Sequence, residues 1–174
     1  MKNELYFKSH ESEMRLFPDF PKTPNEKYVE REIIEMKPSG IPGAGTGVFA
    51  KKDIPINTDL GFYRGQHLTA DEFQKKFSDA GLGTYVLTLD EPSDSNKKFY
   101  VDGLKRGNWT SRINSPKGTT NKVNIVFYTD GRVVSKRNIK AGEELFVGYG
   151  PKYWNNRYWK NNNNNNSTRR VKKN

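Results

Sequence analysis

The sequence contains no cysteine and only two histidines, His10 and His67. Without cysteine, the chain has no disulfide, no thiol nucleophile and no zinc or iron–sulfur site that uses thiolate ligands. Two histidines are also too few for a metal site built from histidine alone. We therefore predict no metal site, and we expect both histidines at the surface.

Long hydrophobic runs are absent as well. No stretch approaches the ~18 apolar residues that a membrane-spanning helix needs, and the start, Met1 to Leu5, lacks the apolar segment of a signal peptide. Both absences predict a soluble, intracellular protein.

The sequence is, in contrast, rich in aromatic residues. Only 33% of its 174 residues are hydrophobic, but 13% are aromatic, with 10 Phe, 9 Tyr and 3 Trp. This length is typical of one domain, and large rings can fill one compact core. The composition predicts a single folded domain.

Positive charge is concentrated at the C-terminal end. Residues 152–174 hold seven Lys and Arg and no acid, so residues 1–151 carry 23 Lys and Arg against 20 Asp and Glu, a net charge of +3. The run Asn161 to Asn166 is of low complexity, and we predict that residues 160–174 form a disordered Asn-rich basic tail. Such a tail either attracts a polyanion such as nucleic acid or serves only for solubility or targeting.

The N-terminal residues differ from the rest. Residues 1–27 mix charge with Pro18, Pro21 and Pro24, which interrupt regular helix, so we predict an arm that lies along a surface. Residues 28–159 then form the folded domain, which ends near Trp159.

Within this domain the pattern is mostly β. Short apolar runs separated by Gly, Pro, Asn or Asp predict strands near 32–36, 47–50, 60–63, 84–89, 99–101, 123–128, 132–135 and 145–147. The dipeptide Asp130-Gly131 predicts a hairpin between the sixth and seventh of them. One helix is expected, because Thr69 and Glu72 form a capping box and Phe73 and Phe77 are four residues apart.

A glycine motif, Gly45-x-Gly47-x-x-Ala50, matches the dinucleotide-binding fingerprint when it is taken alone. That fingerprint requires a strand before it and a long helix after it. Here Pro42 precedes the motif, and Pro55 would break a helix within two turns. We therefore reject the dinucleotide interpretation; the remaining alternatives are a ligand-binding loop and a plain turn between strands.

Five segments occur in an informative order: Gly43 to Ala50, Phe62 to Gly65, Tyr100 to Gly103, Asn108 to Ser115 and Ile139 to Gly150. In that order they resemble the SET-domain protein lysine methyltransferases, over roughly residues 30 to 154. The resemblance implies a mostly β, β-clip-like fold of several short curved sheets with few short helices. It also implies a knot-like crossing of the C-terminal segment, which ordinary connection rules would not suggest.

The resemblance implies S-adenosyl-L-methionine as the cofactor, with S-adenosyl-L-homocysteine as its product. In the family the glycine stretch contacts this cofactor, and glycines let a backbone approach a ligand closely. The implied contacts here are Ala44, Gly45, Thr46 and Gly47.

Further cofactor residues follow from the later segments. Asn114 matches the family's Asn, whose amide binds the amino acid end of the cofactor, and Ser115 stands where most members have His. Cysteine-rich zinc-binding flanks that often close the site cannot exist here. Trp154, in the aromatic cluster after Gly150, is our candidate to stack on the adenine; ordinary core packing is the alternative.

Tyr149 and Tyr63 are the expected catalytic residues. Tyr149 matches the tyrosine of the family's closing Glu-Glu-Leu-x-x-x-Tyr-Gly motif, and Tyr63 matches a second aromatic of the substrate channel. Outside this resemblance each would be taken as a core tyrosine. A lysine must lose its proton before transfer, and aromatic walls that exclude water favour the neutral amine. The third ring of the channel cannot be assigned within residues 121–128.

Departures from the family pattern leave two functions open. Ile41 to Gly45 and the pair Asn108-Trp109 look like the PR branch, which contains both active and silent members. The first function is methyl transfer to a protein lysine, with a histone tail in chromatin as the candidate substrate, which would place the protein in the nucleus. The second is a catalytically silent module that binds a protein or nucleic acid. Glu143 and Glu144 look like an acid pair, but neighbours on a strand face opposite sides.

Overall fold

The computed structural model describes residues 21–77, 85–91, 94–151 and 153–154. These residues form short strands and few short helices, in the order α2 (Pro24–Tyr28), η2 (Val29–Ile33), β1 (Ile34–Pro38), β2 (Thr46–Ala50), β3 (Asp59–Phe62), β4 (Gln66–Leu68), α3 (Ala70–Phe77), β5 (Val86–Glu91), β6 (Asp94–Asp102), α4 (Gly103–Arg106), η3 (Trp109–Arg112), β7 (Ile125–Phe127) and β8 (Arg132–Ser135). The predicted mostly β fold class is confirmed. None of the helices in this part of the chain is long and apolar enough to cross a membrane.

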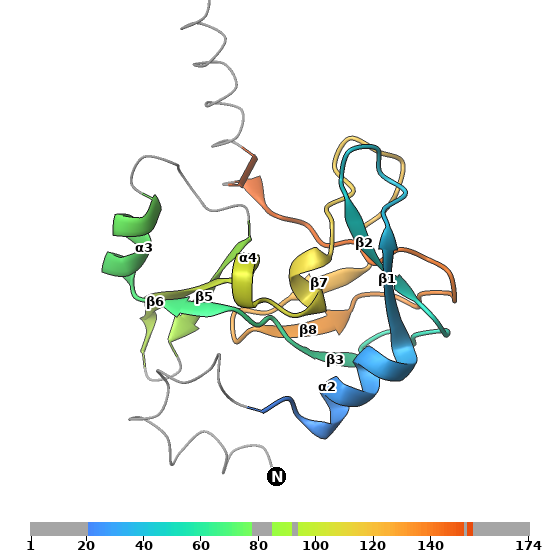
Figure 1. The fold of residues 1–174 in the computed structure, drawn as a ribbon, viewed down its shortest axis with the longest axis horizontal. Helices are drawn as coiled ribbons and strands as arrows, with labels where there is room; N and C mark the ends of the chain where they lie inside the picture. Colours follow the sequence, from blue (N-terminus) through green and yellow to red (C-terminus); the bar gives the residue numbers. More distant parts are fainter. Residues whose placement is uncertain (1–20, 78–84, 92–93, 152, 155–174) are drawn as a thin grey trace, which may run out of the picture.

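The strands form three small antiparallel sheets. Their orders are β1-β2, β3-β8-β7 and β4-β6-β5. Figure 1 shows the β1-β2 pair at one end of the molecule, α3 at the other end, and the β3-β8-β7 sheet between them. The candidate site is built in this middle region.

Two local predictions are confirmed. The β7-β8 hairpin turns at Asp130 and Gly131, where Gly131 has a φ of 87°. Thr69 and Glu72 exchange the two hydrogen bonds of a capping box at the start of α3, where each side chain accepts from the other residue's backbone N–H. The Phe73 and Phe77 rings are 5.1 Å apart, and Phe73 stacks on Tyr100 of β6 at 4.1 Å.

The end of the predicted arm differs from the expectation. Pro24 begins α2 instead of preventing a helix, because proline lacks only an N–H that the first helical turn leaves unpaired in any case. Thr23 caps this helix in a second capping box with Glu26. The arm's residues 1–20 and the predicted tail, with Trp159, lie outside the described residues.

Several strands also differ from the prediction: β4 was not predicted, and β6 begins at Asp94 instead of near residue 99. Residues 32 and 33 belong to the single π-helical turn η2, so β1 begins only at Ile34. Leu145 to Val147 form no named strand, but this segment makes isolated bridges, Phe146 parallel to Asn114 and Val147 parallel to Ile125. These bridges bring the Asn114 and Tyr149 segments together, as the resemblance implies.

One apolar core runs under the three sheets. It is formed by buried side chains from all of them and from the C-terminal segment, among them Val48, Leu60, Val101, Ile113, Ile125, Val133 and Leu145. Tyr63 belongs to this core, and Tyr149 packs against it. The predicted catalytic tyrosines are therefore supported by rigid packing and not by a free loop.

Candidate active site

Tyr63 and Tyr149 line the same cavity. Its volume is about 330 Å³, and most of its wall is apolar or aromatic. Tyr63 follows directly after β3, whereas Tyr149 follows the segment that bridges to β7. Two residues that are 86 positions apart in the sequence thus face one enclosed space.

The Tyr63 phenol is buried and fixed in orientation. Its ring is 7% exposed, and its hydroxyl donates a hydrogen bond of 2.6 Å to the Tyr85 carbonyl. Burial raises the pKa of Tyr63 above its ordinary value, and the neighbouring Tyr149 adds to this shift. Tyr63 therefore remains a neutral phenol at physiological pH.

The Tyr149 phenol is oriented in the same way. Its hydroxyl donates to the Ile113 carbonyl at 2.8 Å, and the Val147 N–H donates to the Asn114 carbonyl at 3.0 Å. In both tyrosines the hydroxyl proton is directed to a main-chain carbonyl. A phenol oxygen that donates its proton in this way can also accept a hydrogen bond through its lone pairs.

Asn108 holds the two sides of this cavity in place. Its side-chain amide donates to the Phe62 carbonyl at 3.1 Å, next to Tyr63. Its carbonyl oxygen caps η3 by accepting from the Thr110 N–H. Because η3 leads to Ile113, which accepts from Tyr149, one side chain links the backbones of both tyrosine positions.

The remaining rings of the cavity were not assigned from sequence. Phe127 lies at the end of β7 with its ring 5.4 Å from that of Tyr63, and the Tyr85 and Tyr153 side chains complete the aromatic wall. Phe127 falls in the segment 121–128 that the resemblance left open. Gly148 also lines the cavity, and a Cβ there would come no closer than 3.9 Å to Val123, so the wall is spacious at this point.

A second cavity adjoins the first. It has a volume of about 560 Å³, is lined by Ser115 and Trp154, and shares Val123, Gly148 and Tyr149 with the tyrosine cavity. Trp154 stacks at 6.0 Å from Tyr149. Two of the predicted cofactor residues therefore meet beside the predicted catalytic tyrosine.

The glycine loop lies on the other side of Asn114. The Asn114 amide donates to the Thr46 carbonyl at 3.1 Å. Gly45 has a φ of 75°, and a Cβ there would meet no atom within 4 Å, so its backbone is open to a ligand. Ala44, Gly45, Thr46 and Gly47 line neither of the two cavities, and neither does Asn114, although its neighbours Ile113 and Ser115 each line one.

Glu144 is a site residue that the sequence argument missed. Its buried carboxylate accepts from the Ser39 hydroxyl at 2.7 Å, the Gly40 N–H at 2.9 Å and the Asn114 amide at 3.3 Å. A Cβ on Gly47 would lie 2.8 Å from its Cδ, so only glycine fits there. Glu144 thus fixes both ends of the glycine loop and Asn114 with one side chain.

The two neighbouring glutamates do not act as a pair. Glu143 points to Arg137, which donates to it at 2.7 Å and holds its pKa below the ordinary value. Glu144 instead points into the loop. The available sequence signal was only the position of Glu144 just before the apolar run Leu145 to Val147, and strand alternation correctly separated it from Glu143.

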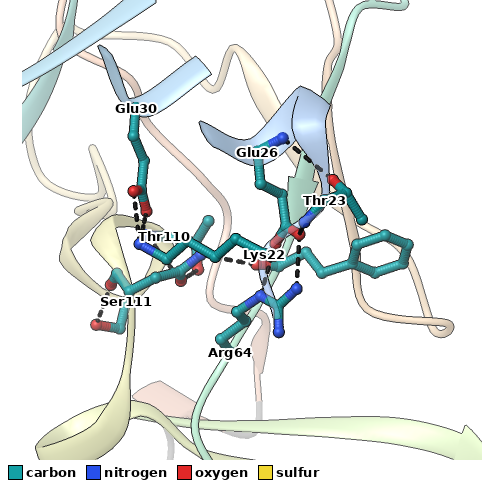
Figure 2. A network of polar contacts seen from close by, with 9 residues as sticks. Lys22, Thr23, Glu26, Glu30, Arg64, Thr110 and Ser111 are labelled. Atoms are coloured by element: carbon teal, nitrogen blue, oxygen red, sulfur yellow. Dashed lines mark hydrogen bonds and ion pairs between the residues drawn. The ribbon is translucent and has the colours of Figure 1, made fainter. Parts of the chain in front are cut away.

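A buried ion pair braces the region next to Tyr63. The Arg64 guanidinium donates twice to the Glu26 carboxylate, with both contacts at 2.6 Å (Figure 2). The Glu26 side chain is 1% exposed and that of Arg64 is 10% exposed. Burial raises the pKa of Glu26, but the hydrogen bonds from Arg64 and Thr23 outweigh this effect, and the pKa is lowered overall. In the described part of the chain, no three His, Asp or Glu side chains come together as metal ligands.

Comparison with known proteins identifies the family of the chain. A family model described as the SET domain matches residues 45–150. The histone-lysine N-methyltransferase SUV39H2 of Gallus gallus is 30% identical over 144 residues, which cover 78% of this chain and 34% of the relative. The histone-lysine N-methyltransferase SETD7 of Halocynthia roretzi is 28% identical over 126 residues, 69% of this chain and 32% of the relative. The chain thus spans about a third of the length of these relatives.

Solved structures share the fold. The crystal structure of the Chaetomium thermophilum polycomb repressive complex 2 is 26% identical, with a TM-score of 0.52 over 68% of this chain and 15% of that chain. The methyltransferase domain of human PR domain-containing protein 2 is 19% identical, with a TM-score of 0.51 over 81% of this chain and 86% of that chain. Both show similarity in fold.

Proposed function

This chain belongs to the SET-domain family, and from that premise we propose that it is an S-adenosyl-L-methionine-dependent protein lysine N-methyltransferase. The observation that carries the proposal is the cavity shared by Tyr63 and Tyr149. Most of its wall is aromatic or aliphatic, which suits the apolar stem of a lysine side chain better than a polar substrate.

The residues around Asn114 fit the cofactor. The open backbone at Gly45, the Asn114 side chain, Ser115 and the Trp154 ring supply a close backbone approach, a polar anchor and a stacking surface. Both Asn114 amide hydrogens are directed to Thr46 and Glu144, so its Oδ1 is the atom that would accept from the ligand's ammonium group. When bound, S-adenosyl-L-methionine supplies a methyl group on a positively charged sulfur.

The chain's own residues would prepare the amine. Burial among Tyr63, Phe127 and Ile125 removes water, which disfavours the ammonium form of a substrate lysine and favours the neutral amine. The lone pairs of the Tyr63 and Tyr149 oxygens would accept from the amine's N–H groups and so orient its own lone pair. In this mechanism neither phenol acts as a base.

The names of the relatives indicate the substrate class. Both relatives are histone-lysine N-methyltransferases, so the proposed partner is a protein lysine, with a histone tail as the first candidate and the nucleus as the proposed location. The Asn108-Trp109 pair supports a finer placement near the PR branch. We propose residues 28–159 as the catalytic domain, residues 1–27 as an arm and residues 160–174 as a disordered tail.

Calorimetric titration with S-adenosyl-L-methionine tests the proposal. We expect binding by the wild type, loss of at least about 10-fold in affinity for Asn114→Ala, and retained binding by Tyr149→Phe. Thermal unfolding of each variant serves as the control for folding. No binding at millimolar cofactor by a folded protein would contradict the enzyme function and favour the alternative, a silent module that binds protein or nucleic acid.

A further inference from the structure

Charge around the two cavities has one sign. Lys136 lines the tyrosine cavity and Lys117 lines the second one, and no Asp or Glu of the described residues lines either. Both lysine side chains belong to exposed residues. A ligand that enters these cavities therefore meets cations and no carboxylate.

A third cation lies beside the tyrosine cavity. The Arg112 guanidinium is 5.3 Å from the centre of the Tyr85 ring, which forms part of the wall. Its charge also acts on the Tyr63 hydroxyl, where it opposes the effect of burial. Arg112 is thus close enough to influence a group inside the cavity.

None of these three cations has a carboxylate partner within the described part of the chain, whereas several other basic residues do. Lys37, Lys76 and Arg137, for example, each pair with an acid. The Lys117 ammonium instead lies 4.7 Å from the centre of the Trp154 ring. Other described lysines also lack an acid partner, but at the two cavities the unpaired cations line or adjoin walls that hold no carboxylate.

Asp102 acts on the Tyr63 hydroxyl more strongly than Arg112 does, but it lines neither cavity. The Asp102 side chain is only 6% exposed, and Lys76 donates to it at 2.8 Å. Asp102 also caps α4 by accepting from the Leu104 N–H. Its carboxylate is paired inside the β4-β6 region and is not presented to a ligand.

We propose that the tyrosine cavity selects a substrate lysine that has Asp or Glu beside it in the substrate chain. This inference rests on the proposed methyltransferase function and narrows its substrate. A lysine side chain that fills the cavity leaves its backbone at the mouth, where a flanking carboxylate can reach Lys136 or Arg112. The same cations disfavour the ammonium form of the entering lysine, so they assist the loss of its proton.

A basic flank would have the opposite effect. Arg or Lys beside the target lysine would meet Lys136 and Arg112 without a counter-charge, and like charges at close range are a strong basis for rejection. Among histone or other protein lysines, those in acidic surroundings are therefore the expected substrates.

The test uses the full 174-residue chain and a peptide library with one fixed lysine and flanking positions randomised over all residues except lysine. Methylated members are identified by mass spectrometry. We expect acidic flanks to exceed basic flanks about 10-fold in kcat/KM, the size expected of one or two solvent-facing charge pairs, and the preference to shrink in high salt. Equal use of both flanks, or a preference for basic ones, would overturn the inference.

A charge-reversal variant at the cavity tests whether Lys136 causes the preference for acidic flanks. Lys136→Glu should bring the ratio of acidic to basic peptides to one or below. The matched control is Lys52→Glu, which makes the same change at an exposed lysine that lines neither cavity and should keep the wild-type ratio. If both variants change the ratio equally, net charge and not the cavity is responsible, and the inference fails.

The two proposals fail in distinguishable ways. Transfer to library members without an acidic preference contradicts only the substrate inference. Transfer to no member at all contradicts the proposed function, and the substrate inference falls with it.

Discussion

Two buried glutamates support opposite sides of the candidate active site, and their partners differ. Glu26 pairs with a cation, since Arg64, which follows Tyr63 in the chain, donates to it twice at 2.6 Å. Glu144 lies next to Asn114 and accepts from neutral donors, namely the Ser39 hydroxyl, the Gly40 N–H and the Asn114 amide.

The difference indicates two kinds of support. A buried ion pair contributes little net stability over apolar residues, but the loss of one partner leaves an isolated charge inside the protein. Neutral donors around a carboxylate also fix the geometry of a loop, but the loss of one such donor costs less stability than the loss of an ion-pair partner. We therefore expect the Glu26 side to govern folding and the Glu144 side to govern cofactor binding.

Removal of Glu26 should give the largest effect. Glu26→Ala leaves the Arg64 guanidinium buried without a counter-charge and should lower the free energy of unfolding by about 3–5 kcal/mol, measured by urea denaturation. Glu32→Ala, which breaks an exposed ion pair with Arg31, should leave the free energy of unfolding nearly unchanged. The double variant Glu26→Met with Arg64→Met should recover most of the loss. A small effect of Glu26→Ala would remove the contrast between the two glutamates.

Each glutamate lies over a glycine, which gives a matched pair of variants. A Cβ at Gly61 would come within 2.6 Å of Glu26 Cγ at a φ of 109°, and a Cβ at Gly47 would lie 2.8 Å from Glu144 Cδ. Gly61→Ala combines a clash with backbone strain and should cost roughly 2–4 kcal/mol of stability. Gly47→Ala should cost roughly 1–3 kcal/mol. In calorimetry, Gly47→Ala should weaken cofactor binding more than Gly61→Ala; the reverse order would contradict the assignment of roles.

Glu144→Gln sharpens the comparison without a change of shape. In the variant, the side-chain NH₂ replaces an oxygen that accepts a hydrogen bond, so two donors face each other. We expect a loss of about 1–2 kcal/mol in stability. The dissociation constant for S-adenosyl-L-methionine should rise about 10-fold, because the glycine loop and Asn114 lose their common anchor. The matched control is Glu143→Gln, whose side chain pairs with Arg137. Equal cofactor affinity in both variants would show that Glu144 only stabilises the fold.

The pH dependence of stability separates the Glu26 side from His67, with the smallest expected effect. Glu26 has a lowered pKa, so its contribution is present above its unfolded pKa and is lost as the pH falls through the lower folded value. Burial lowers the pKa of His67 to about 4, so its contribution is present above about pH 6.5 and is lost as the pH falls toward 4. Between pH 6.5 and 4.5 the loss belongs mainly to His67 and should be roughly 1 kcal/mol after solvent screening. His67→Gln should abolish it in urea titrations; an unchanged loss in this variant would reject the assignment.

His67 also shows how a surface expectation can fail. His67 was expected at the surface, but its ring is half-buried and packs 5.1 Å from Phe99 of the adjacent strand. That contact depends on the pairing of β4 with β6, which no local pattern contains. The expectation of an exposed His67 was wrong for this reason.

The features of the fold that could be predicted were those that depend on residues close together in the sequence. The capping box at Thr69 and the turn at Gly131 depend on residues within four positions of each other, and both were predicted correctly. The brace between Glu26 and Arg64 joins residues 38 positions apart, and nothing in either neighbourhood indicates the other.

The candidate site likewise contains some residues that could be predicted from the sequence and others that could not. Family resemblance gave Tyr63 and Tyr149, and the structure brings both into one cavity. Phe127 and Glu144 were missed because their roles arise from how strands and loops meet. Phe127 faces Tyr63 through the β3-β8-β7 sheet, and Glu144 reaches a loop about a hundred residues earlier in the sequence. The cofactor roles of Ala44, Gly45, Thr46, Gly47, Asn114, Ser115 and Trp154 remain proposals.

The most direct test of the proposed function is methyl transfer under single-turnover conditions. The purified chain, saturated with S-adenosyl-L-methionine, is mixed with a lysine peptide, and the methylated product is followed by mass spectrometry beside Tyr149→Phe. We predict transfer by the wild type and a fall of about 10²-fold or more in the variant at unchanged cofactor binding, because one of the two oxygens that orient the amine is lost. No methyl transfer by a folded, cofactor-bound wild type to any lysine peptide, or full activity in Tyr149→Phe, would contradict the role that we assign to this cavity.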